Sequence, residues 1–447
     1  MRRVAALLLV VTACGARSSL LDEPPARGAM TGTGGAGGSE DPPLPRCDLA
    51  LAGAPAPLLS FPEGDTDAPQ MVVLDGGAAG RPARLAYSAI SENANFWHPE
   101  LRVGELSVGA EWPGGASITR EPSLFGFDAH GAGLLVHGPG DTVALTFYHG
   151  DEANPNVQAR FAFRTVDGAS WNLGPEVVVD PAGTISYGLA HGENGYLAAW
   201  RADIEPTGDV APRIALLDEG GQIVAGPVDV AAPEPHPGRA ADVAWSGTTY
   251  LVATAFDDCE GQPEGCQNRS LVVRRLDETG TLTPASAIAA AAGLVPSRPA
   301  LGAWGNEVWV AWMEAASDDA PRTIRLAQLD VSGALVGAPR TLSTETRPLL
   351  RLGVLVSELG VVVAYPEVGD TRLPESEPGH ARLVVHHGTS LDDGVAPAIV
   401  LPIPSLALGP RVTLAALDQP RGVLVSWAAR SLTEEKNVTW LGRFDCQ

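Results

Sequence analysis

The chain has 447 residues, 45% of them hydrophobic, with 51 Gly and 38 Pro spread along its length. This hydrophobic content suffices for a sizeable core and excludes wholesale disorder. The frequent Gly and Pro favour many short strands joined by turns over long helices. Acidic residues outnumber basic ones by 53 to 30, which gives a formal net charge of −23. A field of this sign repels polyanions, so nucleic acids and anionic membrane surfaces are excluded as partners.

The first fourteen residues combine a positive start, a short apolar run and a cysteine. Two arginines at positions 2 and 3 precede an apolar run, residues 4–11, that is too short to cross a bilayer. The run ends in Val11-Thr12-Ala13-Cys14, which resembles the lipobox of bacterial lipoproteins. This resemblance implies that residues 1–13 are a signal peptide and that Cys14 is lipidated. No later stretch has the roughly 18 apolar residues of a membrane helix, so we expect anchoring by lipid alone.

Residues 14–46 form a segment rich in Gly, Ser and Pro, without an apolar period. Such a composition predicts a flexible tether. For about 30 residues of flexible coil, the root-mean-square reach is about 30 Å. We therefore expect the folded body, residues 47–447, to stand off from the membrane.

A short β-type run recurs seven times in the body. Its copies end at Tyr87, Phe147, Trp200, Thr254, Trp312, Tyr365 and Trp427. The differences between these numbers are 60, 53, 54, 58, 53 and 62 residues. Periods of this size indicate a propeller, a solenoid or an array.

The pattern inside one period selects the propeller. Strands are expected over residues 239–247, 248–256 and 270–277 and near Ser286–Ala290, with a tight turn at Ser246-Gly247. Four short strands without a helical period make one antiparallel blade. The sequence therefore predicts an all-β fold, a seven-bladed β-propeller of four-stranded antiparallel blades.

Aspartate and glycine recur in the turn after the third strand of each period. The instances are Asp167-Gly168, Asp218–Gly221, Asp277–Gly280 and Asp330–Gly333. These residue types satisfy the turn backbone and supply positive φ. One instance, residues 165–171, resembles the Asp-box hairpin of sialidase-like propellers, although one residue is missing between the aspartate and the second glycine position. This resemblance implies a propeller and carries no chemistry.

The two ends of the body predict how the ring closes. The last period ends after its third strand, and residues 51–60 resemble residues 332–343, which hold a fourth-strand position. We therefore expect the N-terminal strand to complete the C-terminal blade, beside residues 438–445. In an oxidising compartment the remaining four cysteines pair as Cys47 with Cys446 and Cys259 with Cys266. No CxxC spacing or histidine cluster supports a metal site instead.

No nucleophile elbow, P-loop, dinucleotide fingerprint or HExxH motif occurs, so no catalytic residue, cofactor or metal is predicted. The adjacent His386 and His387 would point to opposite faces of a strand. Acidic residues recur in the loops expected after the second strands, among them Glu314 and Glu367.

Arginine recurs at the connections that lead into the innermost strands: Arg120, Arg239, Arg298, Arg347 and Arg411. Innermost strands line the central channel. A ring of guanidinium groups at its mouth could bind a carboxylate or a sugar acid. Alternatively, the repeat places arginine there to pair with neighbouring acids.

The signal, tether and repeat region together resemble propeller lipoproteins of GC-rich Gram-negative bacteria, the myxobacteria especially. This resemblance implies a lipid-anchored protein of the outer membrane and no particular activity. The sequence favours a monomeric, non-catalytic binding or scaffolding module that presents one propeller face to a protein or a glycan. The alternative is a carbohydrate-active enzyme, a sialidase-like glycosidase or lyase, whose catalytic residues cannot be matched in this chain.

Overall fold

The computed structural model describes the chain from Cys47 to Gln447 with internal gaps. The described residues are 47–59, 64–66, 70–78, 81–93, 100–114, 116–125, 129–149, 160–181, 183–204, 209–230, 238–256, 270–277, 280–283, 286–288, 294–317, 320–346, 352–369, 372–373, 379–388, 398–403, 412–430 and 437–447. The predicted signal peptide, the lipidation site Cys14, the tether and the predicted Cys259–Cys266 bond lie outside these residues.

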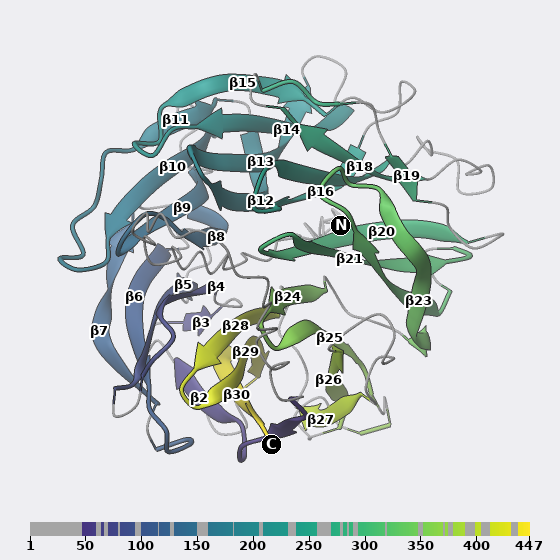
Figure 1. The fold of residues 1–447 in the computed structure, drawn as a ribbon. Coiled ribbons are helices and arrows are strands. Elements are labelled where there is room, and N and C mark those ends of the chain that lie inside the picture. Colours follow the sequence, from purple (N-terminus) through teal and green to yellow (C-terminus); the bar gives the residue numbers. More distant parts are fainter. Residues whose placement is uncertain are drawn as a thin grey trace, which may run out of the picture.

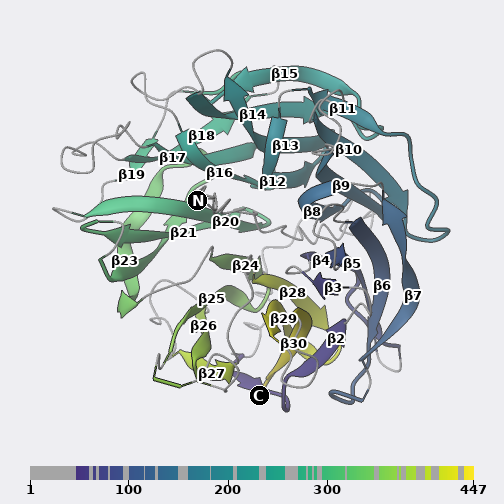
Figure 2. The same cartoon turned by 180° about the vertical axis from the view of Figure 1, so that it is seen from behind.

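Seven antiparallel sheets stand around a common axis, and the described residues contain no helix (Figure 1). This arrangement confirms the predicted seven-bladed propeller. In each blade the chain runs outward from the innermost strand at the centre to the rim. The view from behind shows the same ring (Figure 2).

The first four blades follow one another along the chain. Blade 1 contains β4 (Gln70–Asp75), β5 (Ala83–Asn93), β6 (Glu100–Val108) and β7 (Ala116–Phe125), and β3 (Gly64–Thr66) pairs with the end of β5. Blade 2 contains β8 (Ala129–His137), β9 (Thr142–His149), β10 (Arg160–Asp167) and β11 (Val177–Asp180). Blade 3 contains β12 (Gly183–Gly192), β13 (Gly195–Ile204), β14 (Asp209–Leu217) and β15 (Ile223–Asp229). Blade 4 contains β16 (Gly238–Trp245), β17 (Tyr250–Phe256), β18 (Ser270–Leu276) and β19 (Ser286–Ile288), close to the strands predicted there.

The last three blades complete the ring. Blade 5 contains β20 (Val295–Trp304), β21 (Glu307–Ala315), β22 (Arg322–Leu329) and β23 (Leu335–Thr346). Blade 6 contains β24 (Gly353–Ser357), β25 (Gly360–Val368), β26 (Ala381–Gly388) and β27 (Ile399–Ile403). Blade 7 contains β28 (Thr413–Asp418), β29 (Arg421–Arg430) and β30 (Asn437–Cys446), and its outer position is taken by β1 (Leu49–Leu51) and β2 (Ala56–Leu59).

The core lies between neighbouring blades, because each sheet packs on both of its faces. The second strands are therefore apolar almost without alternation, as in the VWVAWM run of β21, where every residue from Val308 to Ala315 except Glu314 is a buried apolar residue. The seven residues that end the sequence repeats all lie in second strands and are all buried. The repeat in the sequence is thus the repeat of the inter-blade core.

The two ends of the ring axis differ in their connections. At one end lie the links from the first strand of a blade to the second, which are turns of two to seven residues, and the links from the third strand to the fourth; we call this the short-turn face. At the other end lie the links from second to third strands and from one blade to the next, and we call this the long-loop face. Most residues of these links lie outside the described part of the chain.

The ring closes as the sequence predicts. Strand β2 pairs antiparallel with β30, with Ala56 opposite Leu441 and Leu59 opposite Thr439, and β1 adds a further pairing at the end of β30. In Figure 1 the purple β2 lies beside the yellow β30. The predicted disulfide between Cys47 and Cys446 is present, which confirms this pair.

Candidate functional site

The five predicted arginines do not form one ring. Arg239 and Arg298 lie in the innermost strands β16 and β20, as expected. Arg120 lies instead in β7, the outermost strand of blade 1, paired opposite Glu105, so the expectation is wrong for this residue. Arg347 and Arg411 lie outside the described residues.

Arg298 has an unusual backbone. It lies in a bulge of β20, where the pairing with β21 shifts between Ser297 and Ala300, and its φ is 51°. A residue with a Cβ pays about 1–2 kcal/mol for left-handed backbone. Such strain persists only where the surrounding structure imposes it, and it is enriched at functional sites. Arg298 is half-buried near the start of β20, at the long-loop end of an innermost strand.

Two acidic residues expected in the loops of the long-loop face lie in strands instead. Glu314 is in β21 and Glu367 is in β25, and both are buried. The second strands run further than the sequence suggested, because the carboxylates at their ends find partners inside the blade. These partners form supports that we call struts: a buried carboxylate held by an aromatic N–H, by an arginine, or by both.

The strut of blade 3 joins it to blade 2. The Trp200 Nε1–H donates to Asp180 Oδ2 at 2.7 Å, and Arg213 Nη1 donates to the same oxygen at 3.1 Å. Arg213 Nε also donates to Asp229 at 2.6 Å. The hydrogen bonds from Asp229 and then Asp180 raise the pKa of Arg213. Since Asp180 ends the outermost strand of blade 2, this strut ties neighbouring blades together.

Blade 5 repeats the arrangement with a carboxylate from its own strand. The Trp312 Nε1–H donates to Glu314 Oε1 at 2.8 Å, and Arg325 Nε lies 3.7 Å from Glu314 Oε2. Arg325 also donates to the Thr341 hydroxyl. An isolated buried carboxylate would cost several kcal/mol, so the indole and the guanidinium are what allow Glu314 to be buried.

Blade 6 carries a larger group of polar side chains at the equivalent position, near the end of its second strand. Arg382 Nη2 lies 2.6 Å from Glu367 Oε1, and burial of Glu367 raises its pKa while Arg382 opposes this. The Tyr365 hydroxyl lies 3.1 Å from His386 Nε2. Burial raises the pKa of Tyr365 to about 12 and lowers that of His386 to about 4, so both groups are neutral near pH 7. His387 lies on the opposite face of β26, where its Nε2 donates to the Leu359 carbonyl at 2.6 Å.

A regular spacing in the sequence could have revealed the struts. The arginine lies opposite the repeat tryptophan, Arg213 opposite Trp200 and Arg325 opposite Trp312, and in both cases it follows the tryptophan by thirteen residues (213 − 200 and 325 − 312). The arginines predicted to form a ring lie at the innermost strands, so that prediction does not include these third-strand arginines.

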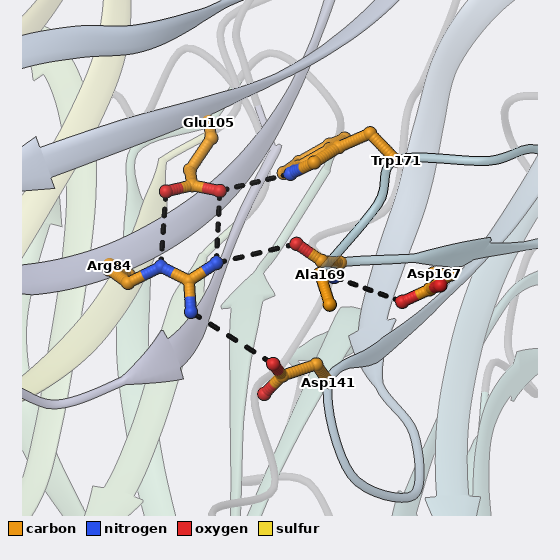
Figure 3. A network of polar contacts seen from close by, with 7 residues as sticks. Arg84, Glu105, Asp141, Asp167, Ala169 and Trp171 are labelled. Atoms are coloured by element: carbon orange, nitrogen blue, oxygen red, sulfur yellow. Dashed lines mark hydrogen bonds and ion pairs between the residues drawn. The ribbon is translucent and has the colours of Figure 1, made fainter.

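The short-turn face is held together by bonds between the turns of neighbouring blades. Glu105 accepts a bidentate contact from Arg84, at 3.1 Å to each oxygen, and a 3.0 Å bond from the Trp171 indole of blade 2 (Figure 3). Arg84 also donates to the Gly168 carbonyl, and its Nη1 lies 4.0 Å from Asp141. These contacts join blade 1 to blade 2.

The Asp-box-like segment, residues 165–171, provides the Trp171 side of this contact between blades 1 and 2. Asp167 accepts bonds from the Ala169 backbone N–H and the Ser170 hydroxyl, and Trp171 adopts a φ of 59°. The segment thus positions the Trp171 indole for Glu105, which is a structural role.

A tyrosine and a glutamate also meet at the short-turn face. Burial and the Glu219 carboxylate raise the pKa of Tyr196 far above its usual value, so its hydroxyl keeps its proton. Glu219 Oε1 lies 3.0 Å from His191 Nε2, and the Tyr250 hydroxyl donates to the Gly195 carbonyl of the adjacent blade. A protonated, fully buried hydroxyl is a poor nucleophile, and the groups described around this pair include no arginine.

Within the described ranges, no three His, Cys, Asp or Glu side chains are grouped so that they could hold a metal ion. In the same part of the chain, no helix has the length and apolar character needed to cross a membrane.

No protein-family model matches the sequence, and no curated protein matches it. Among solved structures, the chain is similar to a Trypanosoma rangeli sialidase mutant displaying trans-sialidase activity, at 10% identity and a TM-score of 0.41, over 70% of this chain and 53% of that chain. It is similar to Pyrococcus horikoshii acylaminoacyl peptidase at 10% identity and a TM-score of 0.43, over 80% and 49%.

A third similar structure is the β-propeller domain of the trilobed protease from Pyrococcus furiosus, at 9% identity and a TM-score of 0.42, over 80% of this chain and 89% of that domain. This chain spans about half the length of the sialidase and the peptidase. Likeness at this distance carries no argument about activity.

Proposed function

We propose that this protein is a non-catalytic binding module of the cell envelope, anchored through a lipid on Cys14, and that it presents its long-loop face to a carboxylate-bearing glycan or protein. The observation that carries this proposal is Arg298, an arginine held in left-handed backbone at the long-loop end of an innermost strand. Because a net charge of −23 repels anions, an anion can be bound only where arginines make the local electrostatic potential positive.

The struts favour a binding function over a catalytic one. Asp180, Glu314 and Glu367 are buried, and each is engaged by an arginine or by both an indole and an arginine. General acid–base chemistry needs a carboxyl group that can reach substrate and exchange protons with it. These carboxylates instead stiffen the strand ends that carry the loops, as a rigid base for recognition requires.

The test replaces Arg298 by glycine, the residue that adopts positive φ without penalty. Arg298→Gly removes the guanidinium and relieves the strained backbone, so the fold should keep its stability to within about 1 kcal/mol. Arg81→Ala, at the exposed β4–β5 turn of the short-turn face, is the matched control because it removes the same charge. Binding is measured on arrayed acidic oligosaccharides and acidic peptides, each beside a neutral counterpart.

We expect wild type and Arg81→Ala to bind acidic probes, and Arg298→Gly to lose at least tenfold in affinity, since a charge-assisted bidentate contact is worth about 1.5–3 kcal/mol. Equal binding by Arg298→Gly would refute the role of Arg298. Release of reducing sugar from the arrayed oligosaccharides would favour the carbohydrate-active enzyme instead.

A further inference from the structure

Pairing in blade 7 fixes the place where the N-terminal segment joins the propeller. Strand β30 is the third strand of its blade, so it begins at the long-loop face and ends with Cys446 at the short-turn face. Strand β1 runs antiparallel to β30, with Leu49 opposite Cys446. Cys47 comes shortly before Leu49 in the chain and therefore lies at the short-turn face. The predicted tether, residues 14–46, joins the body there.

Several contacts hold this junction in place. Cys47 is bonded to Cys446, with a Cα–Cα distance of 4.9 Å, and the Gln447 backbone N–H donates to the Asp48 carbonyl at 3.0 Å. Cys47 is 3% exposed and packs in the apolar cluster between blades 6 and 7. The chain before Cys47 therefore starts from a rigid point at the short-turn edge of blade 7.

The disulfide keeps the junction at this end of β30. Strand β1 has only three residues, and the next strand that pairs with β30 places Ala56 opposite Leu441. Leu441 lies five residues before Cys446 (446 − 441). If β1 came loose, the junction would shift along β30 toward the long-loop face by about 17 Å, at ~3.4 Å per residue of strand. A covalent bond just before β1 prevents this shift.

The position of the junction sets the orientation of a lipid-anchored body. The long-loop face can reach the membrane only if the tether runs back along the whole blade. A strand of ten residues such as β30 is about 33 Å long, and the root-mean-square reach of the predicted tether is about 30 Å. A random coil stretched to its root-mean-square reach is about fivefold rarer than a relaxed one. We infer that the short-turn face is turned toward the anchoring membrane.

This inference rests on the lipid anchoring proposed above, and it specifies where the ligand lies. With the short-turn face toward the membrane, the long-loop face and Arg298 point away from it. A carboxylate-bearing partner then belongs to a glycan or a protein beyond the anchored molecule, and the headgroups of the anchoring lipids are not its source.

Energy transfer to a vesicle surface measures this orientation. A polyhistidine tag replaces residues 1–13 of the Cys14→Ser chain and binds nickel-chelating lipid in phosphatidylcholine vesicles whose headgroups carry an acceptor dye. This anchor stands in for the natural lipid, so the result does not depend on lipidation in the cell. A donor dye is attached through p-azidophenylalanine in place of Asn306 or Ser317, which are exposed beyond the two ends of β21. Asn306 lies at the short-turn face and Ser317 at the long-loop face.

Two matched proteins calibrate the measurement. The first carries the tag after Gln447, which lies at the short-turn face beside Asp48 and is attached without a tether. The second carries residues 15–46 twice, which lowers the penalty for the reversed orientation from about fivefold to about twofold. Neither change alters a residue of the folded body.

We expect the donor at position 306 to transfer more energy than the donor at position 317, with a larger difference in the protein tagged after Gln447 and a smaller one with the doubled tether. Equal transfer from the two positions, or more from position 317, would overturn the inference, and so would a difference that the doubled tether leaves unchanged. The measurement contains no ligand. A failure of Arg298→Gly to weaken binding would therefore refute the proposed function and leave the orientation standing.

Discussion

Arg443 is the residue on which ring closure should depend most. Its side chain is fully buried in β30, where Nε and Nη2 donate to Asp445 at 2.7 and 3.0 Å. Its Nη1 donates across the seam to the carbonyls of Gly109 and Ala110 in blade 1, at 2.6 and 3.2 Å. One guanidinium thus satisfies acceptors from the first and last blades, which are 334 residues apart in the chain.

Replacing Arg443 by methionine keeps most of the volume and removes all of these donors. Breaking a buried ion pair from one side costs about 3–5 kcal/mol. Asp445 is 30% exposed and can recover water, while the two carbonyls lose a charged donor. We therefore expect the free energy of unfolding to fall by about 3–4 kcal/mol. With about 2.1 cal/mol/K of unfolding entropy per residue and about 400 residues, this corresponds to a Tm lower by about 4 °C.

Differential scanning calorimetry measures this shift, and Arg421→Met is the control in the same blade. Arg421 bridges blades 7 and 6 through an exposed contact with Glu358, at 2.9 Å, whose side chains are 23% and 41% exposed. Ion pairs of this kind contribute at most about 1 kcal/mol, or about 1 °C here. If the two variants lose the same small amount of stability, the buried contacts of Arg443 do not stabilise the closed ring.

Three further outcomes are expected. Cys14→Ser should abolish labelling by radioactive palmitate and the partition of the protein into membranes, and an unchanged partition would contradict lipid anchoring. Cys47→Ser with Cys446→Ser opens a loop of 399 residues, for which the loop-entropy model gives a stability loss of up to about 6 kcal/mol, measured by calorimetry. His386 has a folded pKa of about 4 against 6.5, so the unfolded chain binds the extra proton and stability falls by about 3 kcal/mol as the pH drops from 6.5 to 4. His386→Gln should remove this part of the pH dependence of urea unfolding, whereas parallel curves for the two proteins would refute it.

The fold could be predicted because every blade solves the same packing problem. A second strand buried on both faces must be apolar, and its last residue fills the gap between blades, so the repeat appears in the sequence at residues such as Trp200 and Trp312. The closing strand was predictable for the same reason, since residues 51–60 resemble a fourth strand found elsewhere in the chain.

Contacts that occur once could not be predicted in this way. The bonds from Arg443 to Gly109 and Ala110 join distant segments and leave no periodic signal. The sequence predicts Arg120 at a connection into an innermost strand, but it lies in the outermost strand β7. It lies 33 residues after Tyr87, whereas Arg298 lies 44 residues after Thr254, so equivalent spacing would have separated the two.

The contacts that repeat from blade to blade stabilise the fold, so the features that do not repeat are the candidates for ligand binding. The turns of the short-turn face bond to one another, and the struts of blades 3, 5 and 6 satisfy buried carboxylates, so each of these groups has a partner inside the chain. Arg298 departs from the regular strands, because it adopts left-handed backbone in a bulge of the innermost strand β20. Strained backbone of this kind is enriched at functional sites, so substitution of Arg298 should change binding more than stability.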